Sequence, residues 1–269
     1  MTSILSKVYA ILRNEGVTSL AASTRWYITA RSVPWPLRTN PTYLRKYIRF
    51  RQKLQPDRFT DADPFKVIWI DPKEIDYQVR GRRIPLSFGR VSGGDWDLRK
   101  SPFDENLVVR SVQARIREGK SWNETELYAE IEQQESVGSE SSLQGSVKRL
   151  ERIDELAENM RREGYRSQSE LLNDSSADPW ATTERIRGQL HPQLNEIGVN
   201  IARDGEFLWR HRGRHRLAIA RALELDSIAV QVLTRHREWQ DTREMVRDTD
   251  SESELPEVLR SHPDLRELR

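Results

Sequence analysis

Residues 210–216 read Arg-His-Arg-Gly-Arg-His-Arg and stand directly before an apolar helical pattern. A glycine turn at the start of a helix suits an anion, because free N–H groups and the helix dipole both point outward there. Arg214 and Arg216 can offer paired N–H donors to phosphate oxygens, and His215 can donate a hydrogen bond or relay a proton. Gly213 lets the backbone approach a ligand closely. The pattern predicts a phosphate site at these four residues; the alternative is a structural salt-bridge cluster.

A second group of candidate residues surrounds the flexible turn Gly93–Gly94. The carboxylates beside this turn are Asp95, Asp97, Asp104 and Glu105. Carboxylates on such a loop could hold Mg²⁺ with substrate phosphates or deprotonate a hydroxyl group. We predict that Asp95 and Asp97 are catalytic and metal-binding residues, with Asp95 favoured. The alternative is an acidic surface loop in which Trp96 anchors the chain to the core.

The charges are unevenly distributed along the chain. Residues 1–58 contain eleven Lys and Arg against two acidic residues, a net charge of +9, and the remaining 33 basic and 40 acidic residues give −7. This basic amphipathic helical segment predicts contact with an anionic surface, either a membrane surface or, alternatively, nucleic acid. A third interpretation is a helical cap that packs on the body of the protein.

Hydrophobic periodicity predicts an α+β protein. One expected helix begins near Thr42, a second ends near Gly119, and a third carries an apolar stripe from Val147 to Met160. Expected strands and turns include the run Lys66–Pro72 and a hairpin around Asp204–Gly205. A helix follows from residue 214, and a strand rich in β-branched residues follows from residue 227.

Composition narrows the chemistry. The chain has no cysteine, which excludes disulfides, thiolate metal sites and a cysteine nucleophile. No apolar run approaches the roughly 18 to 20 residues that cross a bilayer, and no signal-peptide pattern is present at residue 1. We therefore expect a cytoplasmic protein, with peripheral attachment to a membrane through residues 1–58 as an extension of that expectation.

The order of strand, Asp-Gly turn, strand, helix and strand resembles the C-terminal half of the ParB/sulfiredoxin-like fold. Gly213, His215, Arg216 and Ala220 match the motif with which that superfamily starts a nucleotide-binding helix. The resemblance covers about 66–76 and 146–235. It implies a small mixed sheet with packed helices at 59–240, a mainly helical insertion at about 77–145, and a charged tail at 241–269.

Members of this superfamily share a fold but differ in their activities. The resemblance implies a nucleotide-binding protein that uses ATP or another nucleoside di- or triphosphate with Mg²⁺. We predict a kinase-like phosphotransferase acting on a small-molecule or lipid- or glycan-linked hydroxyl, with Asp95, Asp97 and His215 as catalytic residues. The alternatives are a ParB-like DNA-binding protein or nuclease, and a non-catalytic nucleotide-sensing adaptor.

Overall fold

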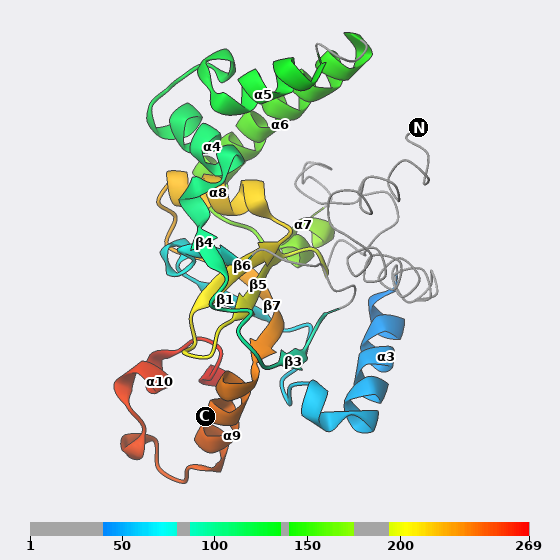
Figure 1. Ribbon diagram of the computed structural model, residues 1–269, viewed down its shortest axis with the longest axis vertical. Helices are drawn as coiled ribbons and strands as arrows, with labels where there is room; N and C mark the ends of the chain where they lie inside the picture. Colours follow the sequence, from blue (N-terminus) through cyan, green and yellow to red (C-terminus); the bar gives the residue numbers. More distant parts are fainter. Residues whose placement is uncertain (1–39, 80–86, 136–139, 175–193, 269) are drawn as a thin grey trace.

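The computed structural model describes residues 40–79, 87–135, 140–174 and 194–268 (Figure 1). A mixed sheet occupies the centre of this part of the chain, with helices at both ends and along one side. The α+β class is therefore confirmed. Of the basic segment at 1–58, residues 1–39 lie outside the described part.

The sheet is built around one long strand. Its strands are β1 (Val67–Ile70), β2 (Tyr77–Val79), β3 (Arg90–Ser92), β4 (Lys100–Pro102), β5 (Ile197–Ile201), β6 (Phe207–His211) and β7 (Ile228–His236). They are ordered β1-β7-β5-β6-β2-β4, and β3 pairs with the far end of β7, beyond β1. Every residue of β7 is buried, as expected for a strand with neighbours on both edges and helices on its faces.

The region expected to be a mainly helical insertion does contain more helix than strand, but its first part also contributes three strands to this sheet. Strands β2, β3 and β4 all lie between residues 77 and 102 and pair with β6, β7 and each other. Each has three residues, too few to show the alternation by which a strand is recognised in a sequence. The helical part of the region begins only at residue 107.

Three helices share the main core with the sheet. They are α4 (Leu107–Arg117), α6 (Glu140–Glu163) and α8 (Arg214–Ala222), and α4 and α6 pack on α8. Figure 1 shows α4 and α6 with α5 (Glu126–Glu135) at one end of the molecule, next to α8. Val109, Ile153 and Leu217 are buried in the same core as the sheet residues. The stripe predicted between Val147 and Met160 is confirmed at Leu150, Ile153 and Met160.

Two further helical parts pack elsewhere on the sheet. Helix α3 (Pro41–Leu54) buries Leu44 and Ile48 in a separate apolar cluster with Phe65, Phe88 and Leu233. The short helix α7 (Gln168–Asn173) precedes the central hairpin. The cap interpretation of the basic segment therefore holds for one face of α3.

The C-terminal part of the chain is folded, although the sequence suggested a charged tail at 241–269. Helices α9 (Arg237–Asp248) and α10 (Glu257–Ser261) lie at the opposite end of the molecule from α5 (Figure 1). Asp264 is buried between Arg235 and Arg243, and Leu265 belongs to the main core. Ion pairing inside the fold accounts for much of the charge that made this segment resemble a tail.

No helix in the described ranges is both long and apolar enough to cross a membrane.

Candidate functional site

The predicted motif lies where β6 turns into α8. The hairpin around Asp204–Gly205 is confirmed, and β6 ends in a turn with two residues of positive φ, Arg212 at 70° and Gly213 at 66°. The indole N–H of Trp209 donates to the Arg212 carbonyl oxygen at 3.0 Å and fixes this turn. A Cβ on Gly213 would lie 2.6 Å from Ile197 Cγ1, so the close approach that requires glycine is to β5.

Arg216 points inward from the first turn of α8. Its guanidinium donates to Tyr165 Oη at 3.2 Å, to Glu196 Oε2 at 3.3 Å and to the Asn195 carbonyl oxygen. Tyr165 also donates to Glu196 at 3.1 Å. Burial raises the pKa of Glu196, although Arg216 opposes this effect. Arg216 therefore holds a buried internal network together.

The other basic groups of the motif crowd the same helix end. Burial, with Arg214, Arg149 on α6 and Arg216, lowers the pKa of His215 to about 4, so its imidazole is neutral at pH 7. Burial and Arg216 lower the pKa of Arg212 to about 9, although Glu196 opposes them. The first turn of α8 contains no acidic residue, and Gly213 offers no side-chain cap. Positive charge thus exceeds negative charge around this turn.

The Gly-Gly-Asp loop is held by ion pairs at a different place. Asp97 is buried, and its carboxylate accepts hydrogen bonds from Arg203 Nε at 2.8 Å and Nη2 at 2.9 Å. Burial alone would raise the pKa of Asp97, but the hydrogen bonds from Arg203 outweigh it and lower the pKa to about 2. His236 lies 3.8 Å from Asp97 and also contacts the Gly94 carbonyl oxygen at 2.9 Å. Asp97 therefore fastens this loop to the ends of β5 and β7.

Asp95 is also paired with Arg203, at 3.1 Å, although its side chain is 73 % exposed. The guanidinium lies against both carboxylates, where a metal ion held by them would have to lie. The predicted Mg²⁺ does not fit this pair, since a cation would have to displace Arg203. Among the described residues, no group of three or more His, Asp or Glu side chains has an arrangement suited to a metal ion.

The two predicted groups lie at opposite ends of β5. Gly213 packs against Ile197 at the start of the strand, and Arg203, which binds Asp95 and Asp97, follows Ile201 at its end. A strand rises about 3.3 Å per residue, so the two ends are roughly 13 Å apart. The structure does not bring these carboxylates to the phosphate motif.

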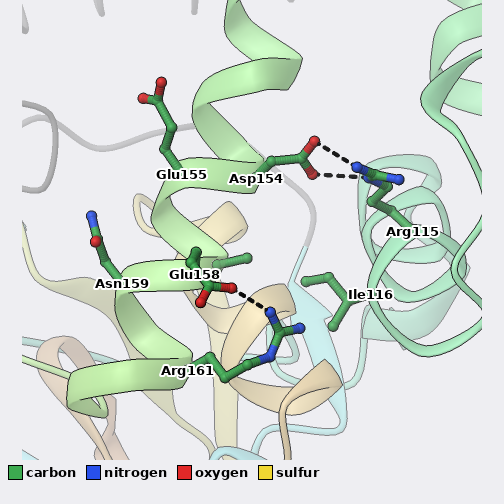
Figure 2. Close-up of a pocket in the computed structure, with 8 residues that line it drawn as sticks. Arg115, Ile116, Asp154, Glu155, Glu158, Asn159 and Arg161 are labelled. Atoms are coloured by element: carbon green, nitrogen blue, oxygen red, sulfur yellow. Dashed lines mark hydrogen bonds and ion pairs between the residues drawn. The ribbon is translucent and has the colours of Figure 1, made fainter.

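A groove between α4 and α6 is the remaining candidate, with a volume of about 780 Å³ (Figure 2). Its charged lining residues are Arg115, Asp154, Glu155, Glu158 and Arg161. Figure 2 shows both arginines paired, Arg115 with Asp154 at 3.0 Å and Arg161 with Glu158 at 2.7 Å. Three carboxylates facing two paired guanidinium groups make this groove unfavourable for a nucleotide.

Sequence reasoning missed three residues around α8. Glu196 and Tyr165 contact Arg216, and Arg149 acts on His215. Glu196 gave one usable signal, since a carboxylate immediately before a mostly apolar strand has to find a partner when it is buried. Arg149 is an exposed residue next to the apolar stripe of α6, and no feature of the sequence indicated that it lies near His215.

Comparison with known proteins gave no match to a family model, a curated protein or a solved structure.

Proposed function

We propose that this protein binds a nucleoside di- or triphosphate with its phosphates at the first turn of α8. One observation carries the proposal. This turn carries the cations Arg214 and Arg216, with Arg149 of α6 close by, and it has no acidic residue and no side-chain cap. Cations at the positive end of a helix dipole are electrostatically unfavourable, and a bound anion relieves the conflict.

The geometry divides the basic residues into two roles. Arg149 and Arg214 are the arginines at this turn outside the buried Arg216 network, and they are proposed to bind a phosphate together with the N–H groups of the first turn. Arg216 is a positioning residue, because its guanidinium is engaged by Glu196 and Tyr165 inside the protein. The Nε–H of Arg212 is buried without an acceptor in the described part of the chain, and it adds a donor near the same turn.

Phosphoryl transfer is the more specific form of the proposal. It requires a base for an acceptor hydroxyl. Glu196 is only 1 % exposed and already accepts from Arg216 and Tyr165, so it positions Arg216. His215, which is half-buried and neutral at pH 7, is the residue of the motif proposed to accept the proton. Asp95 and Asp97 receive no support for this role from the arrangement, because they lie at the other end of β5.

The test is nucleotide binding by the full chain. We expect ATP, ADP, CTP or GTP with Mg²⁺ to raise the melting temperature, because a ligand of the native state stabilises it by an amount that grows with the ratio of ligand concentration to dissociation constant. Replacing Arg149 and Arg214 by glutamine should raise the dissociation constant about tenfold per arginine. Both changes leave the Arg216–Glu196 pair intact.

The matched control is Lys148→Gln, which removes an exposed charge one residue away on another face of α6. It should leave nucleotide binding unchanged. Inorganic triphosphate, tested in parallel, separates recognition of phosphate from recognition of the nucleoside. The proposal fails if no nucleotide stabilises the protein, or if Lys148→Gln weakens binding as much as Arg149→Gln does.

A further inference from the structure

Helix α3 has two faces with different environments. Leu44 and Ile48 are buried against the sheet, as described above. Tyr43, Phe50 and Leu54 stand on another face and are 50 %, 58 % and 62 % exposed. Positions i, i+7 and i+11 lie along one line of a helix, so these three side chains form a single apolar stripe about 17 Å long.

A basic stripe runs beside the apolar one. Lys46, Arg49 and Lys53 are exposed and, within the described ranges, form no ion pair. At about 100° per residue they lie on the face next to the apolar stripe and opposite Leu44. The helix contains no acidic residue that would neutralise them. The outer surface of α3 thus carries large apolar side chains along one line and unpaired cations along the next.

We infer that α3 binds the surface of an anionic membrane, with its apolar stripe in the headgroup and acyl boundary and its basic stripe on the lipid phosphates. Two features favour lipid over nucleic acid. A phosphate backbone would pair with the three cations but would leave the apolar stripe in water, whereas a membrane interface accommodates both stripes. Tyrosine prefers the headgroup level, and Tyr43 begins the stripe.

The position of α3 makes this contact accessible. It lies along one side of the molecule, beside β3 and away from α4, α5 and α6 (Figure 1). Its buried face is fixed by the Leu44–Ile48 contacts, so the helix is preformed and does not have to fold on the membrane. This inference does not depend on the nucleotide site proposed at α8. It adds a location, the surface of an anionic membrane, to the proposed function.

The experiment is sedimentation of the full chain with vesicles of phosphatidylcholine containing phosphatidylserine, and with pure phosphatidylcholine vesicles. We expect binding to the anionic vesicles only. Replacing Phe50 and Leu54 by alanine should lower the partition coefficient about tenfold, and Lys46→Gln with Arg49→Gln and Lys53→Gln should do the same. Residues 1–39 are unchanged in every variant, so the loss reports on α3.

Matched controls separate this effect from general changes in exposed surface. Val258→Ala removes an exposed apolar side chain from α10, and Arg161→Gln with Arg162→Gln removes exposed charges from α6. Both should bind vesicles as the original protein does. Three results would overturn the inference. The first is vesicle binding that survives in both α3 variants. The second is binding of a nucleic-acid duplex that is lost in the lysine and arginine variant but not when Phe50 is replaced, and the third is a dimer in solution that only the Phe50 and Leu54 variant dissociates.

Discussion

Arg216 shows how one residue of a recognition motif can serve the interior of the protein. Its guanidinium lies between Glu196, Tyr165 and the Asn195 carbonyl oxygen, and only 7 % of the residue is exposed. Removing one partner of such a pair leaves a buried charge without compensation. Arg216→Ala would therefore damage the fold as well as any binding site, and the exposed Arg149 is the cleaner probe.

His215 makes stability depend on pH in a defined window. Its pKa is about 4 in the folded protein against 6.5 when unfolded, so the unfolded chain binds the extra proton first as the pH falls. The unfolding free energy should decline from about pH 6.5 to about pH 4, and His215→Gln should flatten part of that decline. Urea denaturation at a series of pH values measures it.

His262 contributes a slope of the same sign below about pH 6.5, because burial lowers its pKa too, and part of the slope should therefore remain in His215→Gln. Asp97, with a pKa of about 2, acts at lower pH. It stabilises the folded protein above about pH 3.8, and this contribution is lost as the pH falls toward 2. An unchanged slope between pH 6.5 and 4 in His215→Gln would contradict the burial of this imidazole among arginines.

Residue types were predicted well, but their partners were not. Gly213, Arg214, His215 and Arg216 do gather at a helix start, as the sequence indicated. Tyr165 lies 51 residues from Arg216 along the chain, and no local pattern connects the two. Ion pairs between distant residues depend on the packing of whole elements. For this reason the sequence suggested a catalytic role for Asp97 and gave no sign of its ion pair with Arg203.

At the scale of elements, Gly213 decides how closely α8 approaches β5. A side chain there has both an unfavourable φ and a collision with Ile197. Gly164 is a matched control, since its φ is +74° and a Cβ on it would meet nothing within 4 Å. We expect Gly164→Ala to cost about 1 kcal/mol from backbone strain alone, and Gly213→Ala to cost at least about 2 kcal/mol more.

Urea denaturation of the two variants measures the difference directly. Equal losses of unfolding free energy would mean that β5 yields easily and that the contact with Ile197 does not hold α8 in place. A larger loss in Gly213→Ala should be accompanied by weaker nucleotide binding, since the first turn of α8 would be displaced.

Elements with a clear pattern were predictable, including the four-residue β1, and the three-residue strands were not. The stripe of α6, the hairpin of β5 and β6, and the nine residues of β7 all carry enough periodicity or β-branched residues to be recognised. Strands β2, β3 and β4 exist because neighbouring strands pair with them, and three residues cannot encode that pairing alone. The region 77–102 was therefore placed outside a sheet to which it belongs.

At the scale of the whole molecule, a buried carboxylate helps to join the C-terminal segment to the core, together with Leu255 and Leu265. Asp264 accepts from Arg235 at 2.9 Å and from the indole of Trp239 at 3.0 Å, and Arg243 lies 3.1 Å from it. We expect Asp264→Asn to lower the unfolding free energy by about 3 kcal/mol, because the buried Arg235 loses its counter-ion while Arg243 keeps Glu267 and Asp61.

Glu257→Gln is the control for this change. Glu257 is an exposed carboxylate on α10 in the same segment, and its replacement should alter stability by no more than about 0.5 kcal/mol. If Asp264→Asn behaves like the control in urea denaturation, the segment after α9 is an appendage and not a structural part of the domain.

The central position of β7 also determines when the sheet can assemble during synthesis. Strand β1 pairs only with β7 among the described strands, so it waits without a partner while roughly 160 further residues are made, about 8 to 30 s at ribosomal speeds. Its sequence, Val-Ile-Trp-Ile, is uncharged, apolar and rich in β-branched residues, the composition that promotes strand association between chains. A newly made copy therefore passes through a period in which this segment can associate with the same segment of another copy, and slower translation lengthens that period.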